Sequence, residues 1–301
     1  MRYGTGVMLV LAAGTLWSLM GLGLRQIEAA SVWAILFWRS VGMLPVLLGW
    51  IAWTSRGRPF AAIRSVGVAG ALGGAGLVVA FGGAIYAIQT TSIANAVFLF
   101  TASPFVAAIL GWIALRETVR PATWGAIALA VIGMFVMVRE GLAIGALAGN
   151  LAALLSAVGF GAFSVALRWG RLADMLPAVL LGAIFSVIAA AIMLVLWGEE
   201  IIVPARDIGI SLAIGAVILA IGMVLYTTGS RVIPAAELTL FSLIEVMLAP
   251  LWVWLLLGET ASSGTFVGGA ILLAAVAFNA VAGAQRRASE GVAPPPIPVN
   301  D

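Results

Sequence analysis

Ten long apolar segments occupy most of this chain, and their lengths constrain the fold more than any other feature. A helix needs about 20 mostly apolar residues to cross the roughly 30 Å hydrocarbon core of a bilayer, and these segments have that length. The alternation of a membrane β-barrel is absent. We therefore expect an all-α polytopic membrane protein with ten transmembrane helices. The predicted helices are 5–24, 32–53, 66–88, 93–115, 121–138, 144–167, 176–197, 208–229, 235–257 and 263–283.

Composition supports this class and excludes several kinds of chemistry. Hydrophobic residues make up 63% of the 301 residues and charged residues only 9%, unlike the balance in soluble domains. The absence of Cys and His removes thiol redox chemistry, disulfides, thiolate metal sites and histidine proton relays. Without Lys there is no Walker A nucleotide loop. We expect no metal site, no cofactor and no ATP-driven motor within this chain.

The distribution of arginines predicts the orientation, because cytoplasmic loops accumulate positive charge. All fifteen basic residues are Arg. With the N-terminus inside, eleven of them face the cytoplasm and three face the outside, and Arg39 remains within the second helix. We expect both termini inside. The net charge of +3 follows from this topology and gives no indication of nucleic-acid binding.

The ten segments form two groups of five that resemble each other at an offset of about 142 residues. Two well-separated anchors share nearly the same offset, which argues for an internal repeat. Five is an odd number of crossings, so the second group must run inverted relative to the first. The matched segments are 17–25 with 160–168, 92–95 with 234–237, and 115–118 with 257–260.

An inverted repeat of this kind is typical of secondary transporters, whose substrate site lies near the bilayer midplane between the halves. We expect a first five-helix repeat at 1–140 and a second, inverted repeat at 141–284. The polar, proline-rich remainder at 285–301 is predicted to be a disordered cytoplasmic tail. Since one chain supplies both halves, a monomer would suffice.

Short motifs in a fixed order carry a resemblance to a known family. They are Leu16-Trp17-Ser18, Phe37-Trp38-Arg39-Ser40, Tyr86-Ala87-Ile88, the stretch from Ser92 to Ala96, and the junctions Arg116-Glu117-Thr118 and Gly258-Glu259-Thr260. The chain resembles the drug/metabolite transporter superfamily in its ten-helix EamA-type branch, over nearly its whole length up to the tail. The resemblance implies a carrier of small molecules in the bacterial inner membrane, without a nucleotide motor and not an enzyme. Within the family it is most similar to exporters of aromatic and other neutral amino acids.

Glu245 lies eleven residues into its predicted helix and so close to the bilayer centre. An acidic side chain there costs about 2.5–3.5 kcal/mol on insertion scales, so it should face a cavity or a partner. It could bind substrate, or it could take up and release a proton during the cycle. The alternative is a structural carboxylic acid hydrogen-bonded between helices.

Arg39 lies seven residues into the second helix, about 10 Å from the outer surface at 1.5 Å per residue. Its guanidinium could bind a substrate carboxylate through two parallel hydrogen bonds or pair with a carboxylate in the cavity. It could also extend to water at the interface.

The repeat offset pairs Asn95 with Glu237 and Ser103 with Glu245, so the fourth helix of each repeat carries polar groups at matching points. We expect these helices to line the pathway. Ser103 and Glu245 would lie deep, Asn95 near the outer mouth and Glu237 at the inner gate. The alternative is ordinary hydrogen bonding between helices, worth about 0.6 kcal/mol per contact.

Pro104 and Pro250 fall in these same two helices, where each removes one backbone donor and crowds the carbonyl four residues earlier. Both are candidate hinges. Packing alone is the alternative, because prolines are common in membrane helices.

Aromatic residues complete the predicted site. Trp17 lies near the middle of the first helix and corresponds to Phe160 in the repeat. With Phe241 they could enclose an apolar or aromatic substrate side chain, although a packing role is equally consistent. Tyr86 and Tyr226, near the ends of their helices, are gate candidates, and Tyr86 is also a candidate substrate contact.

The leading hypothesis is an exporter of amino acids that works by alternating access. An exporter of lipophilic cations that uses Glu245 is the main alternative, and uptake by exchange is another possible mode. A non-transporting membrane scaffold or receptor is a third class, disfavoured by the midplane acid and the absence of any soluble domain.

Overall fold

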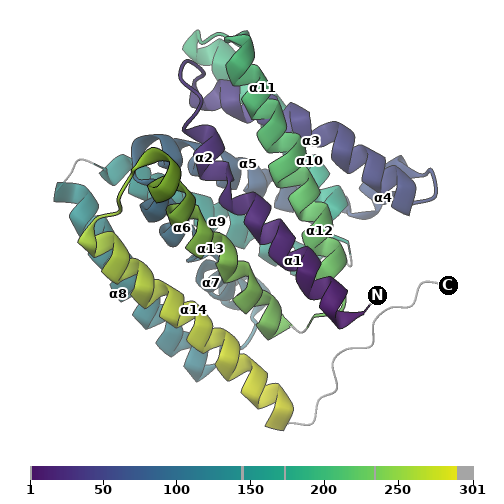
Figure 1. Ribbon diagram of the computed structural model, residues 1–301. Helices are drawn as coiled ribbons and strands as arrows, with labels where there is room; N and C mark the ends of the chain where they lie inside the picture. The colour runs from purple at the N-terminus through teal and green to yellow at the C-terminus, as the bar shows by residue number, and fades with distance from the viewer. Residues whose placement is uncertain (1, 144–145, 173, 234, 290–301) are drawn as a thin grey trace.

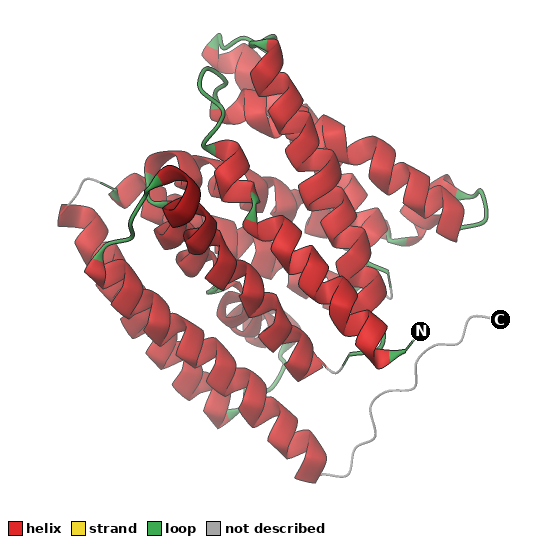
Figure 2. Ribbon diagram, in the orientation of Figure 1, coloured by secondary structure: helices red, strands yellow, loops and turns green. Residues whose placement is uncertain are grey.

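The computed structural model describes residues 2–143, 146–172, 174–233 and 235–289. In these ranges the chain is helical and strands are absent (Figure 2). Nine spans of described helix are long and apolar enough to cross a membrane. The chain is therefore an all-helical, multi-pass membrane protein.

The helices follow one another with short connections (Figure 1). Those of the first half are α1 (Tyr3–Ser18), α2 (Met20–Leu24), α3 (Val32–Thr54), α4 (Pro59–Ser65), α5 (Gly67–Thr90), α6 (Ile93–Phe100), α7 (Ser103–Leu115) and α8 (Pro121–Ala143). Those of the second half are α9 (Leu147–Trp169), α10 (Leu176–Trp197), α11 (Ala205–Ala213), the π-helix η1 (Ile214–Ile221), α12 (Gly222–Ser230), α13 (Ala235–Leu257) and α14 (Ser263–Ser289).

Most predicted helix boundaries agree with these bounds to within a few residues. α13 contains the apolar stretch Leu243–Leu257, which is shorter than the nine long spans, so the count of ten crossings stays a prediction. α14 continues to Ser289, beyond the predicted end at 283. The remainder of the predicted tail, 290–301, lies outside the described residues.

The two prolines predicted as hinges behave differently. α6 ends at Phe100 and α7 begins at Ser103, so that Pro104 occupies the first turn of a new helix, where its missing N–H costs no hydrogen bond. Pro250 instead lies inside α13, which is continuous from Ala235 to Leu257. The helix is therefore interrupted just before Pro104 and continuous through Pro250, and the hinge role stays a prediction for both.

Helices from the two halves of the sequence pack against each other throughout the bundle. α5 packs on α9 and α1 packs on α12, while α7 contacts α9 and α1 contacts α13. α8 lies along α14, and α3 lies along α10 (Figure 1). At the repeat offset, the contact of α5 with α9 corresponds to that of α1 with α12, and the contact of α7 with α9 corresponds to that of α1 with α13. The contacts of α8 with α14 and of α3 with α10 each map onto themselves.

Glycines allow several of these helices to approach until their backbones touch. A Cβ atom on Gly133 of α8 would lie 2.7 Å from the carbonyl oxygen of Gly268 in α14, and one on Gly268 would lie 2.5 Å from the carbonyl oxygen of Gly133. Lipid is as apolar as the bundle interior, so such close van der Waals packing is what drives association of membrane helices.

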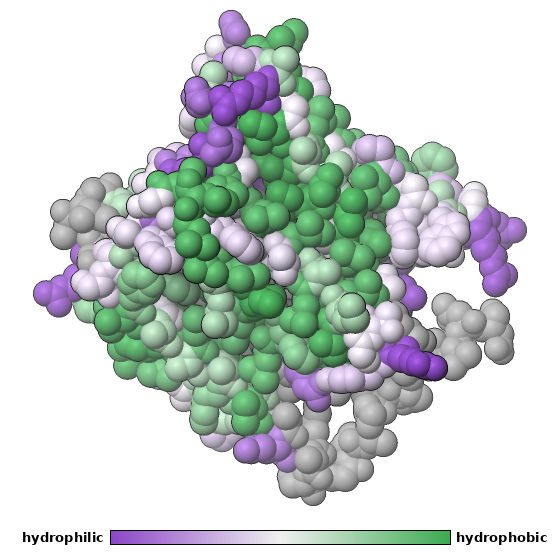
Figure 3. All heavy atoms as spheres, viewed as in Figure 1, coloured by the Kyte–Doolittle hydropathy of each residue, from purple (hydrophilic) through white to green (hydrophobic). Residues whose placement is uncertain are grey.

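The outer surface is strongly apolar. Figure 3 shows apolar residues over most of the visible face, with hydrophilic residues gathered near the ends of helices. Large side chains such as Phe135, Val195 and Leu196 are more than half exposed. A soluble monomer rarely exposes an apolar area of this extent, whereas such side chains are suited to contact with lipid.

Candidate functional site

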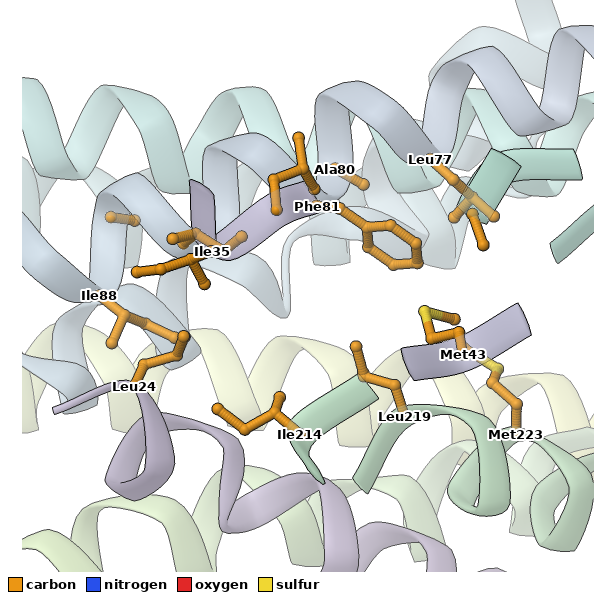
Figure 4. Close-up of a cluster of buried hydrophobic side chains, with 14 of the residues drawn as sticks. Leu24, Ile35, Met43, Leu77, Ala80, Phe81, Ile88, Ile214, Leu219 and Met223 are labelled. Carbon is orange, nitrogen blue, oxygen red and sulfur yellow. The ribbon is translucent and has the colours of Figure 1, made fainter. Parts of the chain in front are cut away.

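A cavity of about 270 Å³ lies inside the bundle, at the meeting of helices from both halves. Its wall includes residues of α1, α2, α3, α5, α6, α7, α9, η1, α12, α13 and α14. Figure 4 labels three of the lining residues within the surrounding hydrophobic cluster: Phe81 of α5, Leu219 of η1 and Met223 of α12. The volume suits a small molecule.

Most of the predicted contact residues lie together in the cavity wall. Five of the eight candidates for substrate contact line it, as do two of the four candidate gate residues. The five are Trp17, Arg39, Ser103, Phe160 and Glu245, and the two are Pro104 and Tyr226.

Arg39 provides a buried positive charge in this wall. Its side chain is 1% exposed, and its guanidinium carbon lies 4.6 Å from the centre of the Phe81 ring. Such a cation–π contact is worth about 2 kcal/mol or more when desolvated. Nε and Nη2 are buried and have no hydrogen-bond partner among the described residues. Arg39 therefore has donors available for a group that enters the cavity.

Trp17 contributes an aromatic ring to the same wall. Its indole ring lies 5.3 Å from the Tyr226 ring, at an interplanar angle of 43°. The indole N–H is buried and has no hydrogen-bond partner in the described part of the chain. Trp17 and Tyr226 thus form one aromatic wall, although the sequence analysis gave them different roles.

Glu245 brings an acidic group into the same cavity from α13. The ion pairs formed by described residues do not include Glu245 or Arg39. The cavity therefore holds a guanidinium and a carboxyl group that do not neutralise each other. A buried charge left unpaired is costly, so the two groups are suited to a ligand with charges of its own.

A second group of aromatic residues also reaches the cavity. The ring of Phe160 lies 5.7 Å from that of Phe100 and 5.6 Å from that of Phe163. Ser103 and Pro104 reach the cavity from the start of α7, just after the break that separates α6 from α7. At this break the Thr101 hydroxyl donates a 2.6 Å hydrogen bond to the carbonyl of Phe98.

Asn95 lies elsewhere, in a buried polar network between helices. Its amide donates hydrogen bonds to Asn150 and, at 3.3 Å, to the Thr91 hydroxyl, and its carbonyl oxygen accepts one from Thr265 at 3.4 Å. Thr91 also donates to Asn150 at 3.1 Å. The network joins α6 to α9 and α14, and Asn95 is absent from the cavity wall described here.

The remaining candidates are also outside this wall. Tyr86 is 40% exposed, and Phe241 is half-buried. Glu237 accepts a hydrogen bond from the Tyr3 hydroxyl, which ties the start of α13 to the start of α1. Pro250 lines a smaller pocket of about 180 Å³ beside Glu259.

Several residues of the cavity wall were not identified from the sequence. The largest are Met20, Phe81, Phe100, Met175 and Met223. Phe81 contacts Arg39 through the cation–π interaction. The two residues meet only because α3 packs against α5, which the sequence does not show. Methionines adapt to irregular spaces, and no spacing in the sequence distinguishes the three in this cavity from other apolar residues.

A metal site is not indicated: within the described residues no cluster of three or more acidic, His or Cys side chains could hold an ion. The cavity's chemistry is that of a binding site with two charged groups and aromatic walls.

Comparison with known proteins gives the same class. The chain is 24% identical over 208 residues to a Bacillus subtilis (strain 168) protein named "Uncharacterized transporter YwfM", an alignment that covers 68% of this chain and 70% of that protein. A protein of known crystal structure shares the fold with a TM-score of 0.65 at 19% identity, over 95% of this chain and 100% of that one. The model of the EamA-like transporter family matches twice, at residues 4–139 and 147–281. The chain belongs to the EamA-like transporter family, within the drug/metabolite transporter superfamily, and is a membrane transporter of small substrates.

Proposed function

We propose that the protein is a secondary transporter that exports amino acids, mainly aromatic and other neutral ones, by alternating access. The observation that carries the proposal is that Arg39 and Glu245 line the same cavity and do not form an ion pair with each other. An α-amino acid is a zwitterion. Its carboxylate complements the guanidinium and its ammonium group complements the carboxylate.

The walls of the cavity favour an apolar or aromatic side chain on the substrate. Two pairs of neighbouring aromatic rings line the cavity, Trp17 with Tyr226 and Phe100 with Phe160. Aromatic rings in offset or tilted contact contribute about 0.5–1.5 kcal/mol beyond the area they bury. The Ser103 hydroxyl adds a polar group to the wall.

The proposed mechanism treats 1–140 and 141–284 as inverted five-helix repeats that rock about the cavity, with both termini in the cytoplasm of a bacterial inner membrane. Two features support it. The family model matches once in each of these segments, and the helix contacts between the halves occur in pairs related by the repeat offset. A monomer contains both halves.

Flux into proteoliposomes tests the proposal. The panel comprises labelled L-phenylalanine, L-tryptophan and L-methionine, together with phenethylamine, which lacks the carboxylate, 3-phenylpropionate, which lacks the ammonium group, and tetraphenylphosphonium. We expect saturable uptake of the three amino acids and at least about tenfold weaker uptake of each single-charge analogue, since each tenfold corresponds to about 1.4 kcal/mol.

The second candidate function is export of lipophilic cations, favoured by the acidic Glu245 among aromatic and methionine side chains. Saturable uptake of tetraphenylphosphonium and phenethylamine, without uptake of the amino acids, would establish it and contradict the first proposal.

A further inference from the structure

Two residues of the cavity wall, Arg39 and Trp17, are contacted by glycines in or directly after the π-helix η1. A Cβ atom on Gly215 would lie 1.8 Å from the carbonyl oxygen of Arg39, and one on Gly222 would lie 2.2 Å from Nε1 of Trp17. Gly215 belongs to η1, and Gly222 is the first residue after it. Neither contact tolerates a side chain without movement of its neighbour.

The π-type winding explains how two glycines seven residues apart reach different neighbours. In an α-helix, residues seven apart share one face, because two turns take 7.2 residues. Hydrogen bonds of the i to i+5 type spread each turn over more residues. Gly215 can therefore contact α3 while Gly222 contacts α1.

Close backbone contact fixes the first end of η1. Gly215 abuts the backbone of Arg39, and Gly42 of α3 abuts that of Leu212 in return, with a Cβ position 2.4 Å from the Leu212 carbonyl oxygen. A backbone atom cannot rotate aside as a side chain can. This reciprocal contact sets the position of η1 and hence the position from which Gly222 faces Trp17.

We propose that Gly222 is a positioning residue that determines specificity. Because it has no side chain, the Trp17 indole occupies the space that a Cβ atom at position 222 would take. The inference rests on the proposed function and extends it to the selection of substrate size. A side chain at 222 displaces the pyrrole edge of Trp17, whose Cδ1 and Cε2 lie 2.8 and 3.0 Å from the Cβ position. The indole then moves toward the cavity and takes space from the substrate side chain.

The test is a double-mutant cycle on transport. Gly222→Ala should raise the KM for L-tryptophan and L-phenylalanine about tenfold, the scale of discrimination that one methylene in a pocket supports. The KM for L-alanine should stay within about twofold, because its side chain needs little of that space. In a Trp17→Leu background, which lacks Nε1 and Cε2, Gly222→Ala should change the KM less than about twofold, since the clash is gone.

Gly209→Ala is the matched control, since this glycine lies on α11 of the same span and a Cβ there meets nothing within 4 Å. It should leave every KM unchanged. Equal KM changes for large and small substrates would contradict the positioning role, and so would additive effects of Trp17→Leu and Gly222→Ala. Saturable flux in the wild-type protein would still support the proposed transport function in either case. Absence of saturable wild-type flux for every amino acid would overturn both.

Discussion

The Arg25 guanidinium lies 3.2 Å from the Glu259 carboxylate and so ties the end of the first span to the turn after α13. Each partner has a further contact. Arg25 donates a 2.8 Å hydrogen bond to the carbonyl of Thr91, and Glu259 accepts one of 2.9 Å from the backbone N–H of Ile93 at the start of α6. Three separate segments of the chain therefore meet at this ion pair.

A second ion pair stands at the repeat offset from the first. Arg168, at the end of α9, lies 2.7 Å from Glu117, in the turn after α7, and also donates to the carbonyl of Ala107 at 2.8 Å. Each pair joins an arginine of one half to a glutamate of the other. In the topology that we propose, the two pairs lie on opposite faces of the membrane.

The two pairs should differ in their effect on stability. The side chains of Arg25 and Glu259 are 27% and 26% exposed, against 44% and 39% for Arg168 and Glu117. Each arginine also donates to a backbone carbonyl, so the difference lies in exposure: exposed pairs contribute only about 0.2–1 kcal/mol, and solvent screens the Arg25 pair less. Arg25→Ala should therefore lower the thermal unfolding midpoint in detergent several degrees more than Arg168→Ala. Equal shifts would contradict this ranking.

Arg39 gives the opposite prediction for stability. Its charge is buried against Phe81 and lacks hydrogen-bond partners for Nε and Nη2 among the described residues. Burying a charge without an ionic partner costs several kcal/mol, more than the roughly 2 kcal/mol that the cation–π contact with Phe81 returns. Arg39→Met should therefore keep or raise the unfolding midpoint while it abolishes saturable amino-acid flux.

The control for this variant is Arg64→Met in α4, where the arginine is exposed. It should preserve flux. A marked fall in the unfolding midpoint of Arg39→Met would mean that the guanidinium supports the fold, and the binding role assigned to it would lose its main argument.

The Asn95 network should affect stability and leave substrate recognition unchanged. Asn150 is fully buried and accepts hydrogen bonds from Thr91 and Asn95. Removing one partner leaves buried donors unsatisfied, at about 1–3 kcal/mol for each. Asn150→Ala should lower the unfolding midpoint by several degrees, and the variant that still folds should keep the wild-type KM.

Asn279→Ala is a suitable comparison, because Asn279 accepts a single hydrogen bond of 2.8 Å from Thr123 between α8 and α14. It should have the smaller effect on the midpoint. A raised KM in Asn150→Ala with an unchanged midpoint would show that the network communicates with the site instead.

The sequence predicted the cavity residues best where a side chain has a high free-energy cost inside the bilayer. Charged side chains deep in a span must face a cavity or a partner, and this rule identified Arg39 and Glu245. The repeat offset from Glu245 added Ser103, and all three line the cavity. The break at Pro104 was predictable for a related reason, since proline lacks the donor that a continuous helix needs.

The same reasoning did not separate a cavity from a network. Asn95 stands eight residues before Ser103 in the same predicted helix, and both are polar residues within a membrane span. Only the packing of α6 against α9 and α14 gives Asn95 its hydrogen-bond partners. The π-helix η1 was also missed, because the run 214–221 consists of apolar residues and one glycine, which carry no signal that distinguishes π from α winding.

Glu245 provides the sharpest test of how the substrate is held. Glu245→Gln keeps the size of the side chain and removes its charge. If the carboxylate binds the substrate ammonium group, the KM for L-phenylalanine should rise at least about tenfold, or about 1.4 kcal/mol. Inhibition by 3-phenylpropionate, which has no ammonium group, should be unchanged or stronger. Glu200→Gln, at an exposed position beyond α10, should leave both values at wild type. Equal weakening of L-phenylalanine and 3-phenylpropionate would contradict direct contact with the ammonium group, because a lost contact cannot weaken a ligand that never makes it.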